Sequence, residues 1–262
     1  IFLNYIDILK IINPKFLIAH EMRSVINATL ADATKHLSID SYLVSHGTHV
    51  TSTNNHHCNY EHRVMAKDIL ASSMATYNIT QSPIAVAAIN SFFPKLKFVQ
   101  YGPIMWGYNL IENSHNLPSE KKSLHILHAS TYKTLTAPRP WIFETSDEFY
   151  ESIRSLIQVV SQIENVFLTI RIRPLPECNL KFIESLASAT ENVEVKTNGE
   201  FISDLQKSDL LVSNSSTTIE EALIYNRDVL LWGYGARYSH TSKIMNDKRI
   251  NENAINIQRL RE

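Results

Sequence analysis

The chain has 262 residues, of which 44% are hydrophobic and 19% are charged, enough to bury the core of one large or two medium globular domains. Its formal net charge of −1 argues against a nucleic-acid-binding protein, because such proteins carry an excess of basic residues. No stretch approaches the roughly 18 apolar residues of a membrane-spanning helix, and no signal-peptide pattern is present. Cys58 and Cys178 stand outside any metal-type spacing and suit a reducing compartment, so we expect a cytoplasmic protein.

Helices and strands are predicted to alternate through the first half of the chain. The expected elements are a helix over residues 1–12, strands over 15–19, 40–45 and 97–101, a helix over 24–36, and periodic segments over 68–77 and 84–89. Asn13-Pro14 ends the first helix, and Ser24 is the expected cap of the second. Because the chain begins with Ile1 inside this helical pattern, we expect the first domain to be incomplete at its start.

A polar stretch over residues 111–123 is the expected linker, which predicts domains over residues 1–115 and 116–262. The second domain repeats the alternation. Its expected strands cover residues 124–129, 166–172, 193–196, 209–213 and 228–231, and its expected helices cover 147–163, 179–189, 200–207 and 217–225. This pattern predicts two Rossmann-type, doubly wound α/β domains with parallel sheets that face a cleft. Ligands of such sheets bind beyond the carboxyl ends of the strands, so the residues after each strand are the first site candidates.

Six small polar residues, SNSSTT from residue 213, stand between a predicted strand and a predicted helix. A hydroxyl at Thr217 or Thr218 with a carboxylate three residues on matches the capping-box spacing. Because the first amides and the dipole of a helix attract anions, we expect a phosphate here, with ribose hydroxyls bound one turn further along. The side chains expected to bind this ligand are Ser213, Ser215, Ser216, Thr217, and Glu220 or Glu221. An ordinary capped helix is the alternative.

Two arginines finish the strand predicted over residues 166–172. Arg171 and Arg173 stand two residues apart, so their side chains point to the same side of an extended chain. Pro174 and Pro176 then stiffen the loop. We expect Arg173 to bind a phosphate or carboxylate through its guanidinium fork. A solvated or salt-bridged arginine pair is the alternative.

The first half carries its own site candidates, again directly after strands. In SHGTH, from residue 45, Gly47 lets the backbone approach a ligand and His46 can take or give a proton near neutral pH. We therefore expect His46 to be a catalytic base, with Gly47, Thr48 and Gly102 lining the cleft. Glu21, after the first strand, is a second candidate base or an acceptor for sugar hydroxyls. The alternatives are a histidine bonded within its loop and a glutamate that caps the next helix.

Two further groups of residues are candidate sites. The sequence NNHHC from residue 54, with Glu61 and His62, lacks the spaced ligand pairs of zinc sites, so we expect a surface or acceptor loop there and no metal. No Asp-x-Asp metal motif is present. Trp232-Gly233, with Tyr234 and Arg237, would line a nucleobase pocket or simply turn the chain.

The order of these segments resembles bacterial surface-polysaccharide glycosyltransferases of the GT-B type. The segments that carry the resemblance are NPKFLIAHE, SIDSYLVSHGTH, LKFVQYGPIMWG, LHILHAST, FLTIRIRP and SDLLVSNSSTTIEEAL. The resemblance covers nearly the whole chain. It is greatest to the broad group that contains capsule and lipopolysaccharide transferases, including the CMP-dependent Kdo and sialic acid transferases, and the CDP-glycerol glycerophosphotransferases. Non-hydrolysing UDP-sugar 2-epimerases share the two-domain form and a comparable helix start.

Within that family, His46-Gly47 and Ser215-Ser216 match short motifs. Arg173-Pro174-Leu175-Pro176 matches an Arg-Pro-His-Pro motif with Leu175 in place of the histidine, which leaves Arg173 to bind phosphate. Because Leu175 has no polar side chain, this position has no imidazole to donate a hydrogen bond to phosphate.

The resemblance implies an enzyme whose first half binds the acceptor and whose second half binds the donor. It would transfer a sugar from a nucleotide donor to a glycan or lipid-linked glycan of the cell surface, with no metal or cofactor. The favoured donor is a CMP-sugar, with Kdo or sialic acid as the sugar. The nucleotide sugar is a substrate. Peripheral attachment to the inner face of the cytoplasmic membrane stays open. The alternatives are a UDP-sugar 2-epimerase and a non-catalytic, nucleotide-sugar-binding subunit of polysaccharide assembly.

Overall fold

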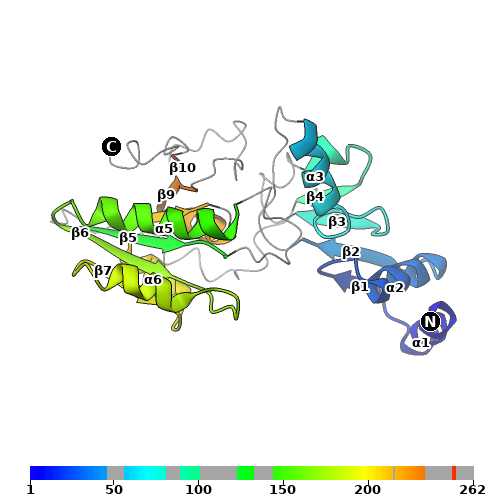
Figure 1. The fold of residues 1–262 in the computed structure, drawn as a ribbon. Coiled ribbons are helices and arrows are strands. Elements are labelled where there is room, and N and C mark those ends of the chain that lie inside the picture. Colours follow the sequence, from blue (N-terminus) through cyan, green and yellow to red (C-terminus); the bar gives the residue numbers. More distant parts are fainter. Residues whose placement is uncertain are drawn as a thin grey trace. The chain divides into compact units, whose positions relative to one another are not determined.

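The computed structural model describes residues 1–45, 56–80, 89–100, 123–132, 144–214, 216–233 and 250–251. The chain divides into two compact units, the first comprising Ile1–Tyr108 with Thr241–Met245, and the second Asn109–His240 with Asn246–Glu262. Each unit contains one parallel sheet (Figure 1). The boundary expected after residue 115 lies outside the described residues. Over the parts of the chain that the structure describes, no helix has the length and hydropathy needed to cross a membrane.

The first unit has a four-stranded parallel sheet in the order β1-β2-β3-β4. Its strands are β1 (Phe16–Ala19), β2 (Asp40–Val44), β3 (Tyr77–Thr80) and β4 (Phe98–Gln100). Helix α2 (Val25–His36) packs Ala31 near Leu43 of β2, and α1 (Phe2–Ile12) packs Leu9 near Ala33 of α2. The hydroxyl of Ser24 accepts from the amide of Asn27 at 3.2 Å, which confirms the expected cap.

The sequence predicts a surface loop at residues 54–62, and this prediction is wrong from His56 on. Helix α3 spans His56–Ala66. The polar composition of this segment is untypical of a helix that packs against a core. Its inward face consists of His62, Met65 and Ala66, which are buried at a spacing of three and four residues. Among the described residues, no group of three or more His, Cys, Asp or Glu side chains is placed to hold a metal ion.

The second unit has a six-stranded parallel sheet in the order β10-β9-β8-β5-β6-β7. Its strands are β5 (Leu124–Ala129), β6 (Val166–Arg171), β7 (Val193–Lys196), β8 (Leu210–Ser213), β9 (Asp228–Leu231) and β10 (Ile250–Asn251). If β5 is counted as the first strand, this order is the Rossmann order 3-2-1-4-5-6, which confirms a doubly wound domain. The strand order reverses between β5 and β8, so the switch point lies there.

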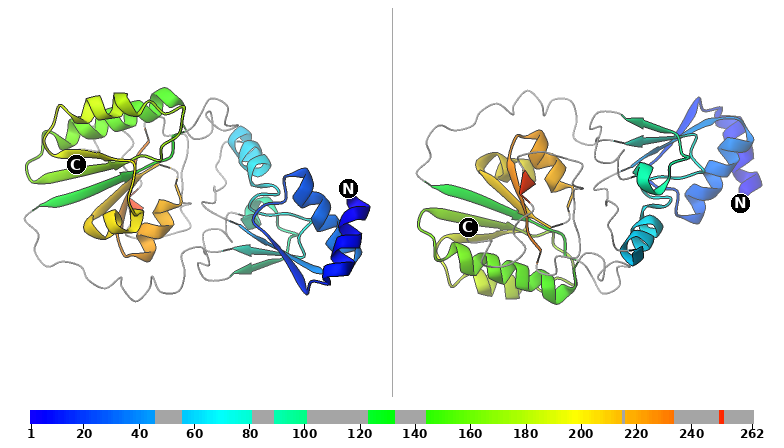
Figure 2. Two further views of the ribbon diagram at one scale, coloured as in Figure 1. Left: turned by 90° about the horizontal axis from the view of Figure 1, so that it is seen from below. Right: turned by 90° about the horizontal axis from the view of Figure 1, so that it is seen from above.

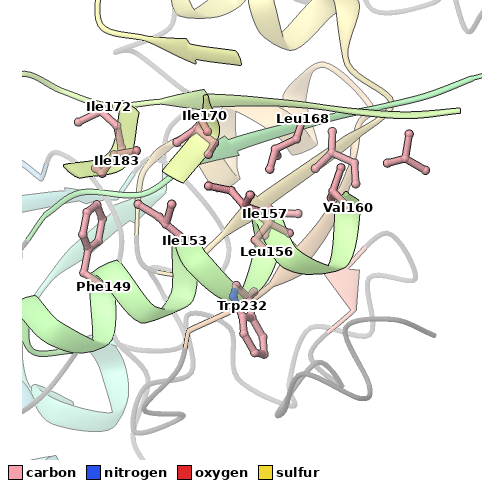
Figure 3. Packing of buried hydrophobic residues seen from close by; sticks show 14 of the residues in the cluster. Phe149, Ile153, Leu156, Ile157, Val160, Leu168, Ile170, Ile172, Ile183 and Trp232 are labelled. Carbon is pink, nitrogen blue, oxygen red and sulfur yellow. The ribbon is translucent and has the colours of Figure 1, made fainter. Parts of the chain in front are cut away.

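Helices cover both faces of this sheet, as Figure 2 shows. They are α5 (Ser146–Val160), α6 (Leu180–Ala187), α7 (Phe201–Lys207) and α8 (Thr218–Ile224). Helices α5 and α6 contribute to one buried cluster, and α7 and α8 to the other. In the first cluster, Ile153 and Ile157 of α5 point toward Leu168 and Ile170 of β6 (Figure 3). The two cores hold the strand ends in place.

The start of α5 is fixed by a capping box that the sequence analysis missed. The hydroxyl of Thr145 accepts from the amide of Glu148 at 3.2 Å, and the carboxylate of Glu148 accepts from the amide of Thr145 at 2.7 Å. Directly after this cap, Phe149 is 1% exposed and packs edge-on against Tyr132, with 5.4 Å between ring centroids. The start of α5 thereby anchors the segment that follows β5.

Candidate functional site

A pocket with a volume of ≈ 380 Å³ lies at the carboxyl edge of the sheet in the second unit. Its walls come from the segments after β5, β6, β7 and β8. Six hydroxyl-bearing residues line it: Ser130, Thr131, Thr197, Ser216, Thr217 and Thr218. Arg171, Arg173 and Glu221 add charge, and Phe201 adds an aromatic ring. The pocket spans the switch point between β5 and β8, where open α/β sheets bind their ligands.

A larger cavity of ≈ 710 Å³ lies at the opposite edge of the same sheet, where β6 and β7 begin. Of the described residues that line it, none is cationic, and Glu164 and Glu191 give it negative charge. Because an anionic ligand would be repelled there and ligands of this fold bind at the carboxyl ends of the strands, the smaller pocket is the candidate site.

The two arginines at the pocket differ in what they contact. The guanidinium of Arg171 forms an ion pair with Asp204 and donates to the carbonyl of Gly199. Arg173 is exposed and makes no hydrogen bond or ion pair with any residue in the described part of the chain. Arg171 is therefore the salt-bridged arginine of the alternative interpretation, whereas the guanidinium of Arg173 lines the pocket without an ion-pair partner among the described residues.

The start of α8 differs from the predicted capping box, and that prediction is wrong. Thr217 makes no side-chain cap hydrogen bond, and the hydroxyl of Thr218 donates to the carbonyl of Ala129 at 3.2 Å. Ser216 takes the place of the cap, because its hydroxyl accepts from Thr218 at 3.3 Å and its carbonyl from Ile219 at 3.2 Å. A tertiary hydrogen bond to β5 has displaced the local one. Neither the backbone amide of Ser216 nor that of Thr217 donates a hydrogen bond to any residue that the structure describes.

The remaining predicted donor-binding residues fall into three groups. Ser216, Thr217 and Glu221 line the pocket. Ser213 and Glu220 do not line it and are buried, with the Ser213 hydroxyl donating to the carbonyl of Ala129 at 2.7 Å. Ser215 lies outside the described residues.

In the first unit, the carboxylate of Glu21 holds the turn that leads into α2. It accepts from the backbone amides of Arg23 at 3.1 Å and Ser24 at 3.3 Å, and from the side chain of Asn27 at 2.9 Å. Burial raises the pKa of Glu21, but the hydrogen bonds with Ser24, Arg23 and Asn27 outweigh it and leave the pKa lowered. A carboxylate with a lowered pKa is a weaker base. His46, Gly47, Thr48 and Gly102 lie outside the described residues.

Among the residues that line the pocket, Ser130, Thr131, Thr197 and Phe201 were not singled out from the sequence. Ser130 and Thr131 come directly after β5, and Thr197 comes directly after β7, with Phe201 at the start of α7. The rule that singled out Ser216, namely that a polar residue follows a buried strand, would have found the first three. They were overlooked because LHILHAST and VEVKTN carry no run of small residues comparable to SNSSTT.

No protein-family model and no curated protein matches the chain. Several solved structures match it. UDP-GlcNAc 2-epimerase from Neisseria meningitidis, bound to UDP-GlcNAc, is 14% identical, with a TM-score of 0.56 over 99% of this chain and 70% of its own. The pneumococcal O-GlcNAc transferase GtfA, solved with UDP and GlcNAc, is 11% identical, with a TM-score of 0.54 over 98% of this chain and 50% of its own. TarM is 16% identical, with a TM-score of 0.58 over 98% of this chain and 49% of its own.

At these identities the likeness establishes the fold and leaves the activity open. The chain spans 70% of the length of the epimerase and about half of the length of GtfA and TarM. The alternation of helices and parallel strands in both units agrees with these neighbours. The chain therefore has a GT-B-like fold built from Rossmann-type domains.

Proposed function

We propose that the second unit binds a nucleotide sugar in the carboxyl-edge pocket and that the chain is a glycosyltransferase. The observation that carries this proposal is the composition of the pocket at the switch point. Arg173, which has no ion-pair partner among the described residues, lines the same cavity as Ser216 and Thr217, whose amides donate to none of those residues. Donors of this kind bind phosphate oxygens. Glu221, on the same wall, would accept from ribose hydroxyls.

The proposed donor carries a uracil base. Sequence resemblance favours a CMP-sugar, but the N. meningitidis epimerase is bound to UDP-GlcNAc and GtfA to UDP and GlcNAc. We therefore place UDP-sugars first and CMP-sugars second. Thermal unfolding with UDP, CMP, CDP and GDP ranks the bases, since a ligand at about 100 times its Kd adds about 2.7 kcal/mol to the apparent stability.

In the proposed reaction, the bond between the sugar and the nucleotide phosphate breaks while an acceptor hydroxyl attacks the sugar. Arg173 and the fixed amide dipoles would stabilise the charge that develops on the leaving phosphate. His46 would remove the proton of the acceptor hydroxyl. The proposed acceptor is a glycan or lipid-linked glycan of the cell surface, capsule or lipopolysaccharide included, which would place the protein at the inner face of the cytoplasmic membrane.

Replacing Arg173 with glutamine tests the donor site. We expect Arg173→Gln to weaken UDP binding by about 10- to 100-fold, because a charge-assisted hydrogen bond to phosphate contributes about 1.5 to 3 kcal/mol. Isothermal titration calorimetry at two salt concentrations gives the affinity and its salt dependence, both of which should fall. The matched control is Arg154→Gln on α5, whose side chain is 52% exposed and pairs with Glu151 away from the pocket. Equal affinities for UDP in the two variants would remove Arg173 from the site.

Epimerisation of a UDP-sugar is the second candidate function. The extent of the structural match favours it, because the chain covers 70% of the length of the N. meningitidis epimerase and 50% of the length of GtfA. Incubation with UDP-GlcNAc and no acceptor separates the two reactions. A C2 epimer detected by NMR would establish the epimerase and end the transferase proposal. UDP binding with neither epimer nor transfer to any glycan acceptor would instead favour a non-catalytic binding subunit.

A further inference from the structure

One side of the candidate pocket is formed by the segment that joins β7 to α7, here called the 197–200 loop. Thr197 at its start lines the pocket, and so does Phe201 directly after it. Gly199 adopts a φ of +82°, a conformation that favours glycine, and the cap residue Glu200 makes no side-chain cap hydrogen bond. The loop therefore lacks the local hydrogen bonds that fix the starts of α2 and α5.

Arg171 holds this loop from the neighbouring strand. Nη2 of Arg171 donates to the carbonyl of Gly199, and Nη1 donates to the carboxylate of Asp204 in α7. The side chains of Arg171 and Asp204 are 15% and 11% exposed, so solvent screens this ion pair little. Asp204 also accepts from Nζ of Lys196 at 3.1 Å. One planar guanidinium thus joins the loop to the first turns of α7.

We propose that Arg171 is a positioning residue of the nucleotide site, which sets the 197–200 loop and so presents Thr197 and Phe201 to the nucleoside. This inference rests on the proposed function. Both terminal nitrogens of Arg171 are already bound to protein, and Asp204 offsets its charge, so Arg171 adds little field for a phosphate. Arg173 makes no such hydrogen bonds and has no ion-pair partner among the described residues. The two arginines therefore act on different parts of the ligand.

The clamp can be tested without a ligand by hydrogen–deuterium exchange. A lysine ammonium is one compact group and cannot span the carbonyl of Gly199 and the carboxylate of Asp204 as a guanidinium fork does. We expect Arg171→Lys and Arg171→Gln to raise amide exchange at residues 199–202 while the peptides of β5 and α5 keep their protection. Asp204→Asn should raise exchange in the same peptides. Unchanged exchange at residues 199–202 in all three variants would overturn the clamp.

Binding of UDP and of uridine then tests the positioning role. We expect Arg171→Lys and Arg171→Gln to weaken both ligands equally, by about tenfold, because the nucleoside wall is no longer preorganised. The ratio of UDP affinity to uridine affinity should stay at the wild-type value. In Arg173→Gln this ratio should fall, since only the phosphates lose a partner. Loss of UDP binding with intact uridine binding in Arg171→Gln, restored in Arg171→Lys, would make Arg171 a direct phosphate ligand and overturn the inference.

Failure of the proposed function gives a different result. If the wild-type chain binds neither UDP nor uridine, the proposed function and the ligand half of this inference are both wrong, whatever the exchange data show. If the wild-type chain binds both ligands and the Arg171 variants bind them unchanged, only the positioning role is wrong. Thermal unfolding of each variant identifies any that has lost its fold, and Asp204→Asn then serves in its place.

Discussion

Replacing His46 with alanine is expected to lower turnover of the nucleotide sugar by about 10²- to 10⁴-fold and to leave UDP affinity unchanged, as removal of a general base does. The matched variant is Glu21→Gln. Glu21 is the other candidate base, but its carboxylate is already bound by two backbone amides and by Asn27, and its pKa is lowered. We expect Glu21→Gln to retain most of the activity.

The measurement is the release of UDP from UDP-GlcNAc, followed with wild type and both variants at saturating donor. Full activity in His46→Ala, or loss of activity in Glu21→Gln with unchanged thermal stability, would move the catalytic base away from His46. Weakened UDP binding in His46→Ala would instead assign this histidine to the donor site, in conflict with the proposed roles of the two units.

Truncating Phe149 to alanine is expected to lower the free energy of unfolding by about 3 to 5 kcal/mol. Phe149 is 1% exposed, and its ring meets Tyr132 and Tyr150 at centroid distances of 5.4 Å and 5.6 Å. A cavity there would remove contacts from α5 and from the segment after β5, which also supplies Ser130 and Thr131 to the pocket. Urea denaturation followed by fluorescence gives the change in stability.

Phe167→Ala is the control for this truncation. Phe167 lies on β6 of the same sheet but is 44% exposed, and it stacks on His125 with a centroid distance of 5.2 Å. Its loss should cost about 1 kcal/mol or less. Similar losses in the two variants would mean that the cluster around α5 is not the core that stabilises the second unit.

The fold was largely predictable because alternating helices and strands admit few arrangements. The segments after β5 alternate strand and helix, and right-handed parallel connections place such segments in a doubly wound sheet. Two elements of the first unit were not predicted. Strand β3 begins at Tyr77, where the periodic segment expected over residues 68–77 ends. In α3, residues such as His56 and Asn59 give a polar composition, and the inward spacing of His62, Met65 and Ala66 was overlooked. Helix periodicity is weak evidence when a histidine occupies a core position.

The candidate site was predictable in outline and not in its contacts. Arg173, Ser216 and Thr217 were identified from their places after strands, and Glu221 from its place one turn into the following helix; all four line one pocket. The partners of Arg171 and Thr218 could not be read from sequence, because Asp204 is 33 residues away and Ala129 is 89 residues away. Local spacing predicted a capping box for α8, and a tertiary hydrogen bond replaced it.

The central claim is that the pocket at the carboxyl ends of β5, β6, β7 and β8 holds the anionic part of a nucleotide. A crystal structure of the chain with UDP tests it most directly. We predict phosphate density within hydrogen-bond distance of the Arg173 guanidinium and of the amides of Ser216 and Thr217. Density for UDP at another place on the chain, with this pocket empty, would contradict the claim.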